Sequence, residues 1–104
     1  MNVPLASGSD GARAREVWQG ICARVLDWRP QLILVSAGFD AHADDPLAFL
    51  TWRERDFAAI TRMICDTAAA CSAPVVSALE GGYDLAALGR SARAHVEVLK
   101  ETSP

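Results

Sequence analysis

The sequence predicts an α/β fold in which three helices alternate with two strands of a parallel sheet. Two continuously apolar runs, residues 32–37 and 75–79, have the composition of strands that are buried on both faces. Three longer segments around them place apolar residues at intervals of three and four, which is typical of helices with one buried face. The predicted order is helix, strand, helix, strand, helix, so the middle forms a right-handed βαβ unit.

The first helix is predicted to begin after Ser9 or Asp10 and to end before Pro30. Either polar side chain can accept a hydrogen bond from a free backbone N–H at the helix start, whereas proline stops the helix. The first strand follows at Leu32 and ends at Gly38. The apolar face of this first helix consists of Ala14, Val17, Trp18, Ile21, Val25 and Leu26.

The second helix is predicted to be capped near Thr51, because Thr51 and Glu54 have the spacing of a capping box. The second strand begins at Pro74 and ends at Gly81. The apolar face of the second helix consists of Phe57, Ile60, Ile64 and Ala68.

The last helix is predicted to be capped by Asp84, with Gly89 as a weak point in its interior. We interpret His95 as a surface residue of this helix. The side chains expected to point inward are Leu85, Leu88, Val96 and Leu99.

Length and composition limit the classes of function. The 104 residues suffice for one domain, and a hydrophobic content of 51% requires a core. A net charge of −3 without a basic cluster predicts neither a nucleic-acid partner nor an anionic membrane partner. The chain shows no secretory signal and no membrane-spanning run, so we expect a cytoplasmic location. Three cysteines without C-x-x-C spacing are interpreted as reduced core residues, namely Cys22, Cys65 and Cys71.

A sheet of two strands leaves both strands with an unpaired edge, although both are as apolar as central strands. Small sheets of this kind are poorly stable, and exposed apolar edges favour aggregation. We therefore expect further strands beside these two, so that residues 1–104 form part of a larger domain. Either a missing upstream segment or self-association of the chain would cover the edges. Whether Met1 is the true start stays open.

Chemistry is expected where two polar loops, residues 38–47 and 80–84, follow the strands. In a parallel sheet both loops emerge at the carboxyl edge, where open α/β folds place their ligands. Asp40, His42 and Tyr83 thereby supply a carboxylate, an imidazole and a phenol at one edge.

These loops carry a resemblance to a known family. Residues 35–42 followed by Asp45-Pro46-Leu47, and then residues 79–85, resemble the C-terminal portion of the zinc-dependent histone deacetylase family. The resemblance is greatest to its bacterial class II-like and acetoin-utilisation-type members, including acetylpolyamine amidohydrolases. The segment Asn2-Val3-Pro4-Leu5 is similar to the family's lead-in to this region. The resemblance covers nearly the whole chain and implies part of an arginase/deacetylase-type parallel sheet.

The resemblance implies a role for each of five residues. Asp40 corresponds to an aspartate ligand of a zinc ion that is held by two aspartates and one histidine. Tyr83 corresponds to the tyrosine that donates a hydrogen bond to the acetyl carbonyl and stabilises the developing oxyanion. Gly81 and Gly82 correspond to a turn that lets the backbone approach the substrate, and Leu47 to a wall of the acyl-lysine tunnel. The implied substrate is an acetyl-lysine or an acetylated polyamine or other small molecule.

Only part of this site lies in the chain. The family's other zinc ligands, an Asp-x-His pair, and its tandem His-His acid/base residues have no counterpart here. The resemblance therefore implies a complete domain that hydrolyses an N-acetyl amide, and a chain that is inactive alone. His42 stands at a metal-site spacing from Asp40, but we favour a hydrogen-bonding role for it. Asp44 and Asp45 before Pro46 are interpreted as turn formers.

Two other functions stay open. A binuclear manganese ureohydrolase of the arginase type has a related fold, and its strand-end motif resembles Asp-x-Asp-x-x-Asp-Pro. In this sequence His42 replaces the middle aspartate, and that motif leaves the turn of residues 80–83 unexplained. The second alternative is a non-enzymatic α/β module that binds another chain through its open sheet edges. One bound zinc, two bound manganese ions or no metal would separate the three functions.

Overall fold

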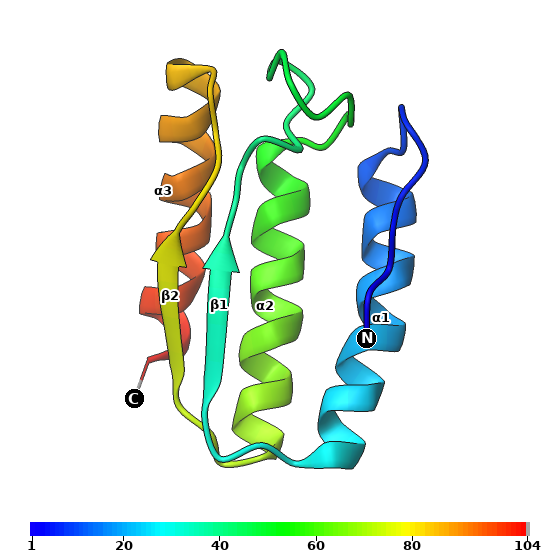
Figure 1. Ribbon diagram of the computed structural model, residues 1–104. Coiled ribbons are helices and arrows are strands. Elements are labelled where there is room, and N and C mark those ends of the chain that lie inside the picture. The colour runs from blue at the N-terminus through cyan, green and yellow to red at the C-terminus, as the bar shows by residue number, and fades with distance from the viewer. Residues whose placement is uncertain (104) are drawn as a thin grey trace.

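Three helices cover one face of a two-stranded parallel sheet (Figure 1). The computed structural model describes residues 1–103. In chain order its elements are α1 (Gly11–Trp28), β1 (Ile33–Ala37), α2 (Glu54–Ala70), β2 (Val75–Leu79) and α3 (Leu85–Thr102). The predicted α/β class and the predicted order of elements are confirmed.

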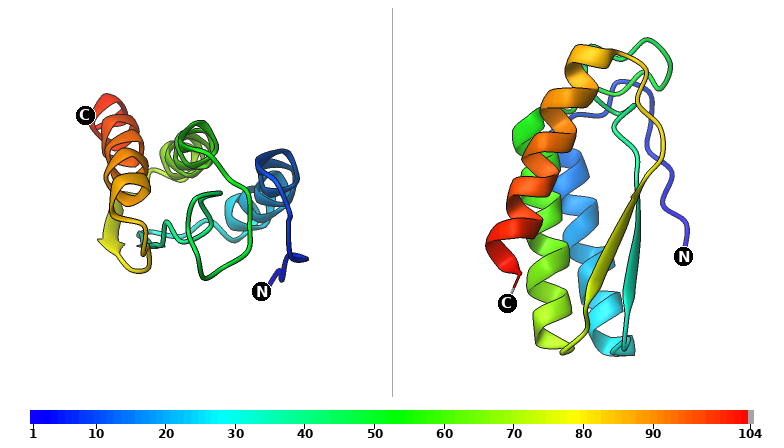
Figure 2. Two further views of the ribbon diagram at one scale, coloured as in Figure 1. Left: turned by 90° about the horizontal axis from the view of Figure 1, so that it is seen from above. Right: turned by 90° about the vertical axis from the view of Figure 1, so that its left-hand side faces the viewer.

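The sheet has one covered face and one open face. The strands pair in parallel with Ile33 opposite Val75, and both side chains pack toward the helices. On the other face Leu34 is 71% exposed and Val76 is 54% exposed. Figure 2 shows the reason, because all three helices lie on the same side of the strands. Within residues 1–103, the prediction of strands buried on both faces is therefore wrong.

Helix α2 lies between α1 and α3 and contributes more buried residues than any other helix or strand (Figure 1). The predicted apolar face of α2 is buried, which confirms that prediction. On α1, by contrast, Leu26 at the end of the predicted apolar face is 38% exposed. No helix among the described residues is both long and apolar enough to cross a membrane. The two clusters of buried side chains consist of Ala37, Phe39, Ala41 and Phe57, and of Ala14, Ile60 and Ile64.

The two aspartate caps are confirmed. The Asp10 carboxylate accepts a hydrogen bond from the Arg13 N–H at 2.9 Å, and the Asp84 carboxylate accepts one from the Ala87 N–H at 2.9 Å. Both bonds satisfy backbone donors that the helix leaves free at its first turn.

The predicted cap of α2 is wrong. Arg53, rather than Thr51, takes the N-cap position, and its N–H donates to the Asp56 carboxylate at 2.8 Å. Thr51 is instead held extended, because its N–H donates to the Ser9 carbonyl at 3.1 Å. Because Thr51 pairs with the N-terminal segment, which is distant in sequence, α2 begins further along the chain than predicted.

Asp56 also joins α2 to α1. Its carboxylate is buried and forms an ion pair with Arg15. The carboxylate lies against Gly11, where any side chain would collide with it. A buried charge is tolerated here because it is paired and hydrogen-bonded.

The predicted inward face of helix α3 is only partly correct: Leu88 and Leu99 are half-buried, and Leu88 packs against the core. Leu85 is 82% exposed and Val96 is 55% exposed. His95, predicted to lie on the surface, is buried. The fully buried side chains of this helix are spaced by four, four and three residues, namely Ala87, Ser91, His95 and Val98.

The burial of His95 is possible because both ring nitrogens find partners. Its Nδ1 lies 2.7 Å from the Thr61 hydroxyl of α2, and its Nε2 lies 2.8 Å from the Ser77 hydroxyl of β2. The Thr61 hydroxyl donates to the Phe57 carbonyl at 2.7 Å, so it accepts from Nδ1–H, and Ser77 donates to Nε2. Burial lowers the pKa of His95, which favours this neutral form.

Candidate functional site

Two loops meet at the carboxyl edge of the sheet, at the top of Figure 1. We call residues 38–53 the first loop and residues 80–84 the second loop. The Glu80 N–H donates to the Ala37 carbonyl at 2.9 Å, and the Phe39 N–H donates to the Gly81 carbonyl at 2.7 Å. These bonds continue the pairing beyond the strands, so the predicted convergence of the two loops is confirmed.

The convergence places the Asp40 side chain against the backbone of the second loop. A Cβ atom at Gly81 would lie 3.2 Å from Asp40 Cγ and 3.3 Å from each carboxylate oxygen. A Cβ atom at Gly38 would lie 3.2 Å from Asp40 Oδ1. Glycine at both positions therefore leaves room for the carboxylate, which remains partly exposed.

Asp45 forms a second connection between the loops. Its Oδ1 accepts from the Leu47 N–H at 2.9 Å, as a turn former would, but its Oδ2 accepts from the Tyr83 N–H at 2.7 Å. Burial opposes ionisation of this carboxyl. Hydrogen bonds from the backbone N–H groups of Leu47, Tyr83 and Asp84 outweigh it and lower the pKa of Asp45. The interpretation of Asp45 as only a turn former was incomplete.

The second loop combines a constrained glycine with an exposed tyrosine. Gly82 has φ +143°, and a Cβ atom there would lie 2.8 Å from Leu88 Cδ1. Such a conformation is accessible in practice to glycine alone. The side chains of Tyr83 and Leu47 are 56% and 59% exposed. Both side chains therefore remain accessible at the loop surface.

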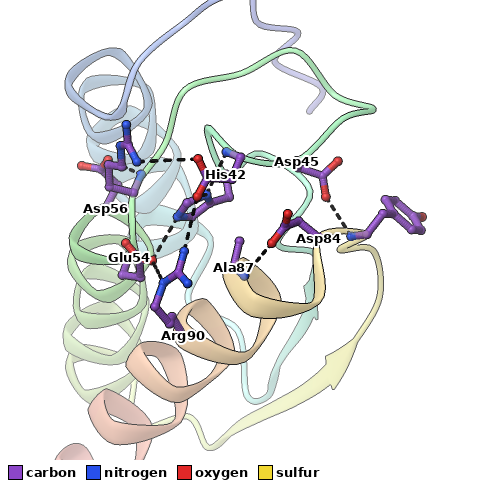
Figure 3. Close-up of polar contacts among 10 residues, drawn as sticks. His42, Asp45, Glu54, Asp56, Asp84, Ala87 and Arg90 are labelled. Carbon is purple, nitrogen blue, oxygen red and sulfur yellow. Dashed lines mark hydrogen bonds and ion pairs between the residues drawn. The ribbon is translucent and has the colours of Figure 1, made fainter.

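His42 anchors the first loop to the helices beneath it. It is 1% exposed. Its Nδ1 accepts from the Asp44 N–H at 3.0 Å, so Nε2 carries the proton and donates to Glu54 Oε1 at 3.1 Å (Figure 3). Both ring nitrogens are thus engaged, which agrees with the predicted hydrogen-bonding role of His42.

Glu54 and Arg90 extend this anchor from α2 to α3. Arg90 Nε donates to Glu54 Oε1 at 2.6 Å, and Figure 3 shows the two side chains directed at each other beside His42. The hydrogen bond from Arg90, assisted by the one from His42, lowers the pKa of Glu54 to about 2. The same contact raises the pKa of Arg90. The carboxylate therefore stays ionised at neutral pH and holds the loop, α2 and α3 together.

Residues 1–103 contain no complete cluster of metal ligands. No three His, Cys, Asp or Glu side chains gather there in a way that could bind a metal. The Asp40 carboxylate is a ligand type that zinc accepts, but a catalytic zinc site uses three protein ligands. Asp40 therefore fits as one ligand, and the others would have to come from additional chain.

Three residues near the site were assigned no functional role from the sequence. The contact of Asp45 with Tyr83 joins positions 38 residues apart, and the sequence marks Asp45 only as a turn former and as part of the motif Asp45-Pro46-Leu47. Glu54 was assigned to a helix cap, and Arg90 carried no signal at all. Their partners lie on other elements, so periodicity and spacing could not identify them.

The chain matches a family model described as "Histone deacetylase domain" over residues 1–99. Type-2 histone deacetylase 1 of Dictyostelium discoideum is 38% identical over 102 residues, which cover 97% of this chain and 7% of that protein. The chain therefore spans a small part of the relative that it matches.

Solved structures agree with this match. The histone deacetylase Clr3 superposes with a TM-score of 0.87 at 28% identity, over 100% of this chain and 17% of that one. An acetylpolyamine aminohydrolase from Burkholderia pseudomallei superposes with a TM-score of 0.86 at 25% identity, over 98% of this chain and 29% of that one. The fold is that of the deacetylases, and the chain corresponds to less than a third of either structure.

Proposed function

We infer that this chain, which belongs to the histone deacetylase family, is the part of a zinc-dependent deacetylase domain that carries Asp40 and Tyr83. The complete domain is a hydrolase that cleaves an N-acetyl amide. The chain alone is inactive, because one of three zinc ligands cannot hold the metal against water.

The observation that carries this proposal is the placement of Asp40 beside the second loop. Its carboxylate lies against Gly81, two residues before Tyr83, at the carboxyl edge of the sheet. A deacetylase needs a carboxylate at the metal and a hydrogen-bond donor for the carbonyl oxygen within one site. Asp40 and Tyr83 offer these two groups from neighbouring loops.

Each residue of the two loops then has a definite task. A zinc ion bound with the help of Asp40 would activate a water molecule and polarise the acetyl carbonyl. The Tyr83 phenol donates a hydrogen bond that strengthens as the carbonyl oxygen gains charge. Gly81 and Gly82 let the backbone approach the substrate closely, and Leu47 forms a wall for the acyl chain.

We propose an acetyl-lysine or an acetylated polyamine or similar small molecule as the substrate. The net charge of −3 favours neither nucleic acid nor an anionic membrane as a partner. The partner that the chain does require is the remainder of the domain, or another copy of itself, against its open sheet edges. We propose a cytoplasmic location.

A ureohydrolase with two manganese ions fits less well. In that motif the position of His42 would supply a metal ligand, but both nitrogens of this imidazole are engaged with Asp44 and Glu54. The family match also favours the deacetylase.

The proposal is tested in a completed domain. There, residues 1–104 are joined to the remainder of a deacetylase domain, taken from the upstream reading frame or from the B. pseudomallei acetylpolyamine aminohydrolase. Asp40→Ala should abolish zinc content and release of acetate together. Tyr83→Phe should keep the zinc and lower kcat about a hundredfold to a thousandfold.

Asp44→Ala is the matched control, because Asp44 lies in the same loop with a half-exposed carboxylate. It should keep both zinc and activity. His42→Ala should reduce activity less than either site variant and keep the zinc. Normal zinc in Asp40→Ala, full activity in Tyr83→Phe, or loss of zinc in His42→Ala would contradict the assignment.

A further inference from the structure

Asp45 is buried in a loop, yet one of its carboxylate oxygens is directed to a different loop. It is 7% exposed. Oδ1 accepts from the Leu47 N–H within its own loop, and Oδ2 accepts from the Tyr83 N–H across the site. A buried carboxylate must be satisfied by hydrogen bonds, and here each oxygen has a backbone donor.

We propose that Asp45 is a positioning residue for Tyr83, an inference that rests on the catalytic role proposed for Tyr83. The Asp45 carboxylate fixes the Tyr83 backbone relative to the loop that carries Asp40. It thereby sets where the phenol stands with respect to the metal ligand, without itself touching the substrate.

The second loop needs such a restraint because of what flanks Tyr83. Before it stand two glycines, which have no side chain of their own to limit the backbone dihedral angles. After it, Asp84 caps α3 through the Ala87 N–H and is thereby fixed. The Tyr83 side chain is 56% exposed. The hydrogen bond to Asp45 therefore restrains the backbone between the glycine pair and the N-cap of α3.

The geometry is strong enough for this task. An N–H donor 2.7 Å from an ionised carboxylate oxygen forms a charge-assisted hydrogen bond, which is about twice as strong as a neutral one. The same loops are also joined by the bond from Phe39 N–H to the Gly81 carbonyl, two residues earlier. The Phe39 bond fixes the start of the second loop, and the Asp45 bond fixes its end.

The test is a double-mutant cycle in the completed domain. Asp45→Asn keeps the shape of the side chain but replaces one acceptor oxygen by an NH₂ donor. We expect it to lower kcat about tenfold, since small misplacements of a catalytic group have effects of this order or larger, with zinc content unchanged. In the Tyr83→Phe background the same substitution should change kcat less than twofold, because the phenol to be positioned is already gone.

A merely structural role predicts a different pattern. A general loss of folding would lower activity by the same factor in both backgrounds, and that result would overturn the positioning role while leaving the proposed function intact. Full activity of Tyr83→Phe would overturn the proposed function itself. Asp44→Asn, which removes the neighbouring charge, is the control and should match the parent enzyme. If Asp45→Asn does not fold, the cycle is run with Asp45→Ser, which keeps one acceptor oxygen and is judged by the same outcomes.

Discussion

The open face of the sheet makes a quantitative prediction about the completed domain. Val76 on this face is 54% exposed in the chain, and Val96 on α3 is 55% exposed. We expect the remainder of the domain to cover Val76 and to leave Val96 in solvent. Valine and threonine have nearly the same shape, so Val→Thr at each position tests mainly whether an added hydroxyl meets water.

The size of the effect follows from this difference in covering. A hydroxyl buried without a partner costs about 1–3 kcal/mol, whereas a substitution on an exposed surface changes stability by about 0.5 kcal/mol or less. Val76→Thr should therefore lower the free energy of unfolding of the completed domain by about 2 kcal/mol. Val96→Thr should leave it nearly unchanged. Both values are measured by urea unfolding, and equal effects at the two positions would refute the covering of this face.

The same face has a second consequence for the isolated chain. There Val76 and Leu34 expose apolar surface beside unpaired strand edges, so the chain should self-associate or pack loosely. Val76→Lys should reduce the self-association, because a charge on an exposed sheet opposes edge-to-edge contact. Val96→Lys adds the same charge elsewhere and is the control. A sharp monomer in analytical ultracentrifugation of the unmodified chain would show that this face needs no cover.

Three further predictions concern the metal, one glycine and one histidine. The isolated chain should retain no stoichiometric zinc through gel filtration and should not hydrolyse a fluorogenic acetyl-lysine substrate, since Asp40 is its one matched ligand. Retention of stoichiometric zinc, or hydrolysis of the substrate, would contradict this prediction. Gly82→Ala should destabilise the completed domain by about 1–3 kcal/mol in urea unfolding because of its positive φ, whereas Gly89→Ala, in a helix with open space around it, should stabilise it. Because burial lowers the pKa of His95 in the folded state, the unfolded state binds the proton more readily. The free energy of unfolding should therefore fall as the pH drops below about 6.5. In a plot of Tm against pH, His95→Leu should reduce the fall in Tm over this acidic range.

Local signals in the sequence were sufficient for most of the fold. Asp10 and Asp84 stand immediately before the helices that they cap, and the bonds that they form span three residues. The apolar stripe of α2 follows from its own spacing. Continuous apolar runs and the glycines after them located both strands, and parallel pairing then brought Asp40 and Tyr83 to one edge.

The errors arose where a distant partner decided the outcome. Thr51 pairs with Ser9, which lies 42 residues earlier, so it could not cap α2. His95 is polar and was placed on the surface, but hydroxyl groups from α2 and β2 satisfy its ring and permit its burial. The apolar Leu85 and Val96 are predicted to lie inside. Because α2 and α3 pack closely, however, small residues such as Ala87 and Ser91 take the buried positions. Residue type alone could not indicate these partners.

Restraints that hold Asp40 and Tyr83 in place lie within the chain, whereas the proposed zinc site would take its remaining ligands from elsewhere. The bonds of Phe39 with Gly81, of Asp45 with Tyr83 and of His42 with Glu54 all join residues of one βαβ unit. The relative position of the two loops can therefore form before the rest of the site is present. Metal affinity would then depend on bringing further ligands to a carboxylate that is already oriented. For this reason a change at Asp40 should be seen in zinc content, and a change at Asp45 should be seen in kcat with zinc still bound.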